Sequence, residues 1–147
     1  MSDDYSKIPY KNILAWRKGY EFVIEVYRTI KNFPIEERYG IVSQLRRAAV
    51  SVLANIVEGR AKRSVSEKEF LRFLSIAKGS LWECEFFLGL SRDLGYLNKD
   101  EFAFLEDLRS QTAYLLHEFM KKIKKDMGKS TVSDTNVASD ASGASVA

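Results

Sequence analysis

The sequence predicts an all-α protein that folds as an antiparallel, up-down-up-down four-helix bundle. The chain of 147 residues contains only 2 prolines and 8 glycines, and so few helix breakers favour long helices over a turn-rich β fold. Apolar residues recur at spacings of three and four in four separate segments, which is the spacing of one helix face. The connections between these segments are short, so consecutive helices are expected to run in opposite directions.

The first segment is expected to form a helix that begins near Asn12, after a flexible lead-in at residues 1–10. It ends at Phe33 and Pro34, because the residue before a proline avoids helical dihedral angles. The apolar stripe of this helix consists of Ile13, Trp16, Tyr20, Val23, Tyr27 and Ile30.

The second helix is expected to begin directly at Pro34, which suits a first helical turn, with Glu36 and Glu37 at the positive end of the helix dipole. From Ala48 onward this helix is nearly apolar all round, so it must be covered on several sides. We therefore expect a subunit interface here in addition to the core of the bundle. Gly59 is expected to loosen the helix before a basic loop. The apolar stripe consists of Ile41, Leu45, Ala48, Val52 and Ile56.

Two local patterns mark the starts of the third and fourth helices. Ser66 with Glu69, and Asn98 with Glu101, match the capping box, in which side chains satisfy free backbone N–H groups of the first turn. Gly95 is expected to end the third helix as a C-cap. The apolar stripes are Phe70, Leu74, Ala77, Leu81, Cys84 and Leu88 in the third helix, and Leu105, Leu108, Thr112, Leu115, Phe119 and Ile123 in the fourth.

Residues 11–127 are expected to form the bundle, and residues 128–147 a disordered tail that has no aromatic residue, Leu or Ile to bury. The N-terminus has no apolar segment typical of a signal peptide, and no apolar run approaches the roughly 20 residues that span a bilayer. The single cysteine, Cys84, cannot form an internal disulfide. We therefore expect a cytoplasmic protein with no membrane partner.

The sequence lacks the usual catalytic and metal-binding patterns. A di-iron bundle needs Glu-x-x-His pairs, but the chain has one histidine, His117, and Tyr114 stands three residues before it. Cys84 lies on an apolar stripe, which predicts a small buried side chain and not a nucleophile. No glycine-rich phosphate-binding or dinucleotide-binding motif occurs. We expect no enzyme activity, no cofactor and no metal ion, and a metal-dependent bundle enzyme is the least favoured alternative.

Polar side chains at helical spacing cross the otherwise apolar second helix. One interpretation is a buried hydrogen-bonded network that fixes the register between helices or subunits, with Glu83 or Glu85 pairing an arginine. The other interpretation is a contact to a ligand or to RNA. We favour the structural one, because nothing in the stripe resembles a specific site. The stripe consists of Gln44, Arg47, Ser51, Asn55 and Glu58.

Candidate contacts to phosphate groups lie in the expected basic loop. The overall net charge is only +3, but Arg60, Lys62 and Arg63 are clustered, and Arg46 is expected nearby in the second helix. An ordinary solvated helix end explains the same cluster equally well. Aromatic side chains could stack on bases. Most of them lie on apolar stripes, and Phe86 is the exception.

Three sequence segments resemble a known family. The run QLRRAAVSVLANIVEG at residues 44–59, with FPIEERYG at 33–40 and FLRFLSIAKGSLWECEFFL at 70–88, resembles the 23S rRNA intervening-sequence proteins, and the similarity covers residues 10–125. The chain departs from a typical member in its long C-terminal tail. It also has Val52-Leu53 where members often carry Ile-Pro.

The resemblance implies a four-helix bundle that assembles into a homopentameric ring. Some bacterial members are encoded inside intervening sequences of large-subunit rRNA genes. A related bundle is the accessory protein of diversity-generating retroelements, which binds a reverse transcriptase. The resemblance supplies no catalytic residues.

These observations predict a non-enzymatic, homo-oligomeric bundle that binds RNA, another nucleic acid or a nucleic-acid-processing partner. One alternative is a protein–protein scaffold with no affinity for nucleic acid. A second alternative is a reverse-transcriptase accessory protein.

Overall fold

The computed structural model describes residues 7–141, and the side chains of residues 7–133. Within this part of the chain every regular element is helical. Two short 3₁₀ helices, η2 (Pro9–Asn12) and η3 (Ile35–Glu37), precede the first and second long helices. The long helices are α1 (Leu14–Ile30), α2 (Ile41–Lys62), α3 (Glu67–Asp93) and α4 (Lys99–Ala141).

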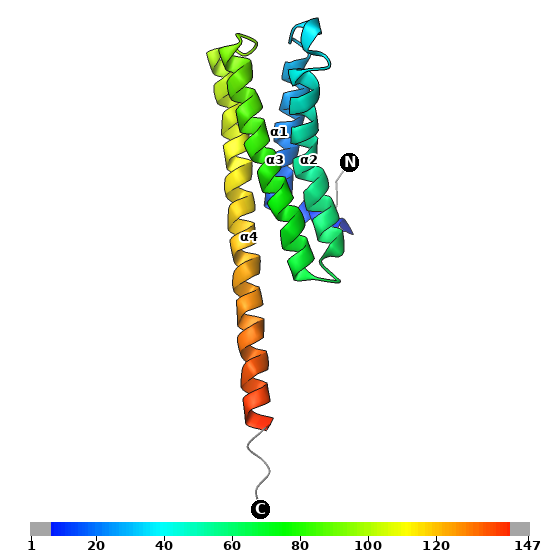
Figure 1. Ribbon diagram of the computed structural model, residues 1–147, viewed down its shortest axis with the longest axis vertical. Helices are drawn as coiled ribbons and strands as arrows, with labels where there is room; N and C mark the ends of the chain where they lie inside the picture. The colour runs from blue at the N-terminus through cyan, green and yellow to red at the C-terminus, as the bar shows by residue number, and fades with distance from the viewer. Residues whose placement is uncertain (1–6, 142–147) are drawn as a thin grey trace, which may run out of the picture.

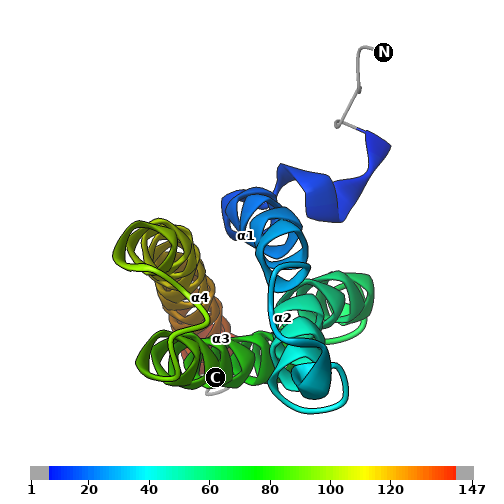
Figure 2. The ribbon, with the colours of Figure 1, turned by 90° about the horizontal axis from the view of Figure 1, so that it is seen from above.

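The four long helices alternate in direction and pack in chain order (Figure 1). Seen from above, α1, α2, α3 and α4 surround one common interior, and η2 leads into the start of α1 from outside it (Figure 2). The expected all-helical fold with four helices is therefore confirmed. The assembly of several copies into a ring stays a prediction.

The helix ends follow the local signals in the sequence. The Ser66 hydroxyl accepts a hydrogen bond of 3.2 Å from the Glu69 backbone N–H, and Asn98 Oδ1 accepts one of 2.8 Å from the Glu101 N–H. Gly95 has φ +80°, the left-handed conformation that ends helices. The N-cap half of each expected capping box and the glycine at the end of α3 are confirmed, because each depends only on residues a few positions apart. The reciprocal half at α3 is not formed, since the Ser66 N–H donates to the Lys62 carbonyl and the Glu69 carboxylate pairs with Arg72.

The core has two apolar clusters stacked along the bundle. The upper cluster contains Phe22, Leu45 and Leu88, and the lower one contains Ile56 and Phe70. All members of the stripes expected in α2 and α3 are buried, so both stripes are confirmed. These stripes are continuous and unambiguous along their helices, which is why spacing alone identified them.

The stripes expected in α1 and α4 are partly wrong. In α1, Tyr20 and Tyr27 are 49% and 41% exposed, and Phe22 and Val26 are buried instead. A tyrosine hydroxyl needs a hydrogen-bonding partner when buried, whereas phenylalanine and valine have none to satisfy. In α4, Leu115 and Phe119 are only partly buried, and the fully packed positions are Leu116 and Met120.

The second helix differs from the prediction at both ends. It begins at Ile41 and not at Pro34, because η3 and Gly40 intervene. It also continues through Gly59 to Lys62, so the expected basic loop is the last helical turn. Gly59 permits close packing, since an added Cβ would lie 2.8 Å from Phe73 Cβ and would also crowd the Phe70 ring.

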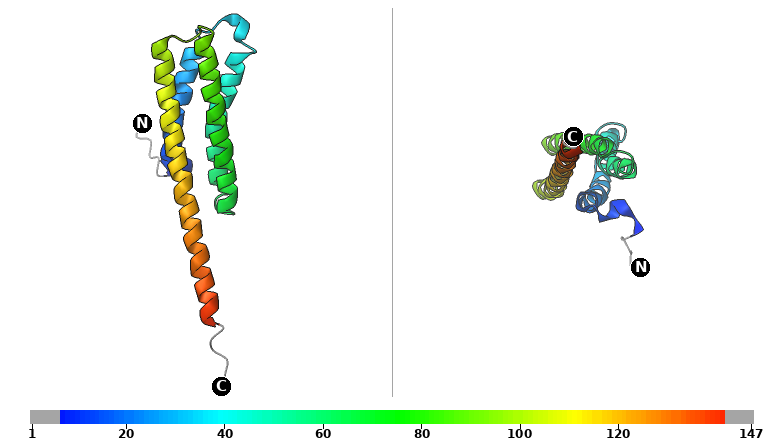
Figure 3. Two further views of the ribbon diagram at one scale, coloured as in Figure 1. Left: turned by 60° about the vertical axis from the view of Figure 1, so that its left-hand side comes forward. Right: turned by 90° about the horizontal axis from the view of Figure 1, so that it is seen from below.

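The fourth helix extends past the bundle. Met127 is its last side chain that packs on the core, and the side chains of residues 128–133 are exposed. The helix nevertheless runs to Ala141 beyond the other three helices (Figure 3), where the sequence predicted a disordered tail. Helical hydrogen bonds are local, so a helix already nucleated in the bundle propagates without apolar burial. Residues 1–6 of the expected lead-in and 142–147 of the tail lie outside the described residues.

Close packing at Gly59 leads to a stability prediction with a matched control. Gly59→Ala should lower the free energy of unfolding by about 1–3 kcal/mol, because its methyl group overpacks the contact with α3. Gly79→Ala should raise it by about 1 kcal/mol, because Gly79 is exposed in α3 with open space around it. Urea denaturation followed by circular dichroism measures both. Equal effects of the two variants would contradict the close contact at Gly59.

Candidate nucleic-acid interface

Charge is segregated along the length of the bundle. The half around the lower core cluster is formed by residues 7–20, 50–82 and 110–133, which we call the basic end. It carries fifteen Lys and Arg residues and five Asp and Glu residues. The other half of the described side chains, residues 21–49 and 83–109, carries eight basic and eleven acidic residues. The small overall net charge therefore conceals one strongly basic end.

The structure places the predicted phosphate-contact residues in two separate regions. Arg60 and Lys62 lie in the last turn of α2, and Arg63 caps it. Arg46 lies fourteen residues earlier on the same helix, about 21 Å away at 1.5 Å per residue. The expectation that Arg46 lies beside the cluster is wrong. The cation that does join the cluster is Lys122, which sequence spacing missed because it comes from α4.

Arg60, Arg63 and Lys122 line the same pocket but differ in their hydrogen-bond and ion-pair partners. Arg63 donates a hydrogen bond of 2.9 Å to Glu67 Oε1, and its guanidinium lies 5.3 Å from the centre of the Phe70 ring. Arg60 is half-buried, and its side chain makes no hydrogen bond or ion pair within the described part of the chain. The same holds for the exposed Lys122. Arg60 and Lys122 are thus available to an anion.

A pocket of about 740 Å³ opens between these cations. It exists because the helices differ in length. The 17 residues of α1 span about 25 Å and the 22 residues of α2 about 33 Å, so α2 extends beyond the start of α1. The polar lining is Asn12, Arg60, Arg63, Glu118 and Lys122, and the apolar lining is Pro9, Ile13, Leu14, Ala15, Leu115 and Phe119.

The polar stripe of α2 is only partly buried. Asn55 donates to the Ser51 hydroxyl at 3.0 Å, the Ser51 and Ser80 hydroxyls lie 2.8 Å apart, and Ser80 donates to the carbonyl of Ile76. This short chain of hydrogen bonds joins α2 to α3. The remaining members, Gln44, Arg47 and Glu58, are exposed. Within one copy of the chain the hydrogen-bonded part of the stripe is therefore limited to Ser51 and Asn55, and a role of the three exposed positions at a subunit interface stays a prediction.

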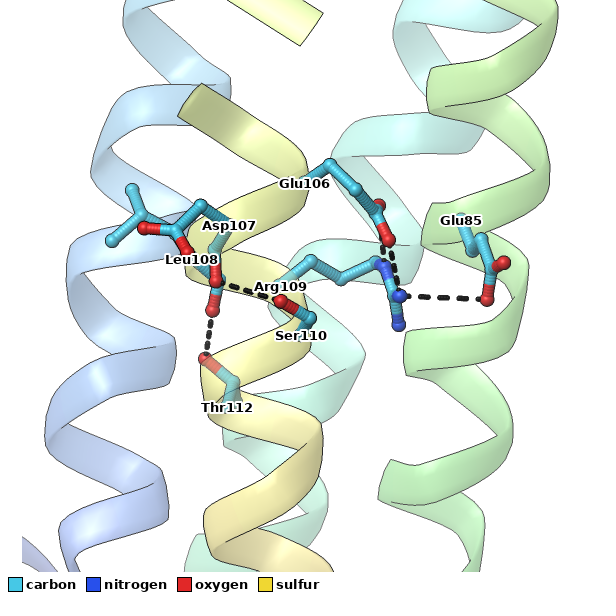
Figure 4. Close-up of polar contacts among 7 residues, drawn as sticks. All are labelled: Glu85, Glu106, Asp107, Leu108, Arg109, Ser110 and Thr112. Atoms are coloured by element: carbon cyan, nitrogen blue, oxygen red, sulfur yellow. Dashed lines mark hydrogen bonds and ion pairs between the residues drawn. The ribbon is translucent and has the colours of Figure 1, made fainter. Parts of the chain in front are cut away.

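Arg109 of α4 is a buried cation, and no pattern in the sequence marked it. It donates a hydrogen bond of 2.7 Å to Glu106, and its guanidinium lies 3.5 Å from Glu85 on α3 (Figure 4). Glu85 thus pairs with an arginine of α4 and not with Arg47 of the polar stripe. The hydrogen bond to Glu106 raises the pKa of Arg109, against the opposing effect of burial. Because carboxylates already satisfy Arg109, its role is structural.

An exposed apolar face lies on the outer side of α3. Trp82 and Phe86 are 67% and 62% exposed, and Leu90 continues the row one turn later. We call these three residues the aromatic face. A hollow of about 450 Å³ adjoins it, partly because Gly89 has no side chain to fill the space. Exposure of Phe86 was expected from its position off the main stripe, and exposure of Trp82 was not.

Cys84 is buried in the core, whereas His117 is exposed on α4. Burial raises the pKa of the Cys84 thiol to about 12. His117 is exposed beside Lys78, Lys121 and Lys124. Within residues 7–133 no three His, Cys, Asp or Glu side chains are placed to hold a metal ion. None of the described helices combines the length and the apolar character needed to cross a membrane.

Comparisons with known proteins connect this geometry to a family. The family model described as 23S rRNA-intervening sequence protein matches residues 11–118. No curated protein matches the chain. A similar crystal structure is that of a protein of unknown function from the S23 ribosomal protein family of Bacteroides thetaiotaomicron. Its TM-score is 0.65 at 22% identity over 74% of this chain and 99% of that chain, which shows a shared fold. Neither description names a catalytic activity.

The reactivity of the Cys84 thiol tests whether this side chain is buried. The folded thiol should not react with a thiol reagent at pH 8 until urea unfolds the protein, because only accessible thiolate reacts. The unfolded thiol ionises near pH 9.0, so the stability contributed by Cys84 is complete below that pH and is lost as the pH rises toward 12. Cys84→Ala should lack this part of the alkaline destabilisation. Rapid labelling of native protein would contradict the buried position.

Proposed function

The chain belongs to the family of 23S rRNA-intervening sequence proteins, and we propose that it is a non-enzymatic, self-associating bundle whose basic end binds structured RNA. The observation that carries the proposal is the segregation of charge. One end of the bundle carries fifteen basic and five acidic side chains, although the whole chain has a net charge of only +3. A surface of one sign attracts a polyanion and orients it during the encounter.

The basic end suits folded RNA because its charges come from all four helices and cover a broad surface. Phosphate contacts dominate the affinity of such surfaces and carry little sequence information. The partly buried and unpaired guanidinium of Arg60 supports a ligand role over simple solvation of a helix end. Structured RNA presents phosphate groups along several directions, and the cations of the basic end likewise come from all four helices.

Self-association is proposed to use the aromatic face of α3. Trp and Phe exposed to this degree on one helix are typical of protein interfaces, where aromatic side chains contribute most of the binding energy. In a closed ring of five copies this face must meet a different surface of the next copy. Exposed Phe104 and Tyr114 make α4 the counterpart that we propose.

A protein scaffold with no RNA affinity is the alternative that the aromatic face favours. Its residues lie on the outer side of α3, so a different protein could occupy them in place of a second copy. A reverse-transcriptase accessory protein would use the aromatic face and the basic end together. Affinity for RNA and the molar mass in solution separate these possibilities.

The first measurement is a titration of labelled structured RNA and of unrelated duplex DNA, followed by fluorescence anisotropy at low and near-physiological salt. The triple variant Arg60→Gln, Lys62→Gln, Lys122→Gln should bind RNA more weakly. It should also reduce the slope of log affinity against log salt by up to about 3, one for each lost phosphate contact. Neutralising three cations elsewhere, with Lys31→Gln, Arg46→Gln and Lys99→Gln, should change the slope much less.

Two outcomes of this titration would count against the proposal. Absence of RNA binding by the wild type near physiological salt would favour the protein scaffold. Equal loss in both triple variants would mean that the charge acts diffusely and that the basic end has no special role.

The second measurement is the molar mass in solution, by light scattering at micromolar concentration. The wild type should exceed the 16.8 kDa of a single chain several-fold, and the double variant Trp82→Gln, Phe86→Gln should approach that value. Tyr39→Gln with Leu94→Gln removes exposed apolar area outside the aromatic face and should leave the assembly intact. A monomeric wild type would reject self-association, and unaltered assembly of Trp82→Gln, Phe86→Gln would reject this surface.

A further inference from the structure

The pocket at the start of α1 combines features that a plain phosphate contact does not need. Six apolar residues form its walls, and the cations Arg60, Arg63 and Lys122 lie with them. Its volume of about 740 Å³ falls within the range of roughly 300–1,000 Å³ typical of small-molecule sites. An occupant that matches this lining has a flat apolar body and an attached negative charge.

The carboxylate of Glu118 narrows the choice of occupant. It lines the same pocket one helical turn before Lys122, and it would repel a phosphate group placed beside it. A carboxylate does, however, accept hydrogen bonds from the exocyclic amino group of a nucleobase. Asn12, whose Oδ1 accepts a hydrogen bond of 3.5 Å from Arg17, keeps its amide nitrogen as a donor to a base edge.

We propose that this pocket holds one unpaired nucleobase of the bound RNA. The base lies against the apolar wall formed by Leu14, Leu115 and Phe119. Arg60 and Lys122 contact the phosphates on either side of it, and Glu118 accepts a hydrogen bond from its amino group. The inference rests on the proposed RNA binding and deepens it, because it names a bulged or looped nucleotide as the feature recognised. Unstacked bases of this kind are the usual targets of sequence-specific RNA recognition.

The test compares two labelled RNA hairpins that differ only in one bulged adenosine. The wild type should bind the bulged hairpin about tenfold more tightly than the fully paired one, because base stacking contributes that much per base. A bulged uridine, which lacks an exocyclic amino group, should bind several-fold more weakly than a bulged adenosine. Glu118→Gln should reduce this difference between the bases.

Substitutions at exposed residues test the pocket without disturbing the fold. Leu14 is 60% exposed, so Leu14→Gln should fold normally, lose most of the preference for the bulge and still bind the paired hairpin. Leu94→Gln, the same change at an exposed leucine of the other half, should keep the preference. Circular dichroism of both variants checks that the helices are intact.

Three results would contradict the proposal, each at a different step. Equal affinity of the wild type for both hairpins would overturn the nucleobase pocket and leave RNA binding by the basic end standing. No binding of either hairpin near physiological salt would overturn the proposed function itself. Displacement of the bulged hairpin by adenosine monophosphate, at concentrations comparable to the RNA, would identify a site for free nucleotides and overturn the RNA assignment.

Discussion

Antiparallel packing of four helices of unequal length around one apolar interior determines where every surface group lies. The packing of α2 on α3 is close, since Gly59 leaves no room for a methyl group between its backbone and Phe73. With that contact set, α2 extends beyond the start of α1. The space under α1 becomes the pocket, and the chain segments that surround it become the basic end. The surfaces follow from helix length and direction.

Polar groups near the interior divide into two kinds. Arg109 and the chain from Asn55 through Ser51 to Ser80 find partners within the bundle, so they link helices and have little left to offer a ligand. Arg60 is partly buried and finds no side-chain partner within the described residues. Partial desolvation strengthens the attraction of such a cation for an anion, because less water screens it. This difference separates structural cations from the candidate binding site.

The two proposed surfaces do not compete for the same residues. The aromatic face lies on the outer side of α3, and the pocket lies among the start of α1, the last turn of α2 and the middle of α4. A copy bound at the aromatic face leaves the pocket open. Several basic ends in one assembly would then engage one RNA together, which raises the overall affinity without any new contact.

The sequence by itself determined the helices and many of their ends. The caps at Ser66, Gly95 and Asn98, and the stripe from Phe70 to Leu88, depend on residues a few positions apart, and such spacing is visible in the chain. It also showed that Arg60, Lys62 and Arg63 cluster, because they are neighbours in the chain. The family resemblance was likewise confirmed over residues 11–118.

Only the tertiary structure decided which face of α1 is buried, that Gly59 is a packing contact, and that Lys122 of α4 joins the cluster. Spacing along the chain does not report the relative heights of helices far apart in sequence. Those heights are fixed by the packing of side chains across the core. For the same reason a net charge of +3 revealed nothing of an end with fifteen basic and five acidic residues.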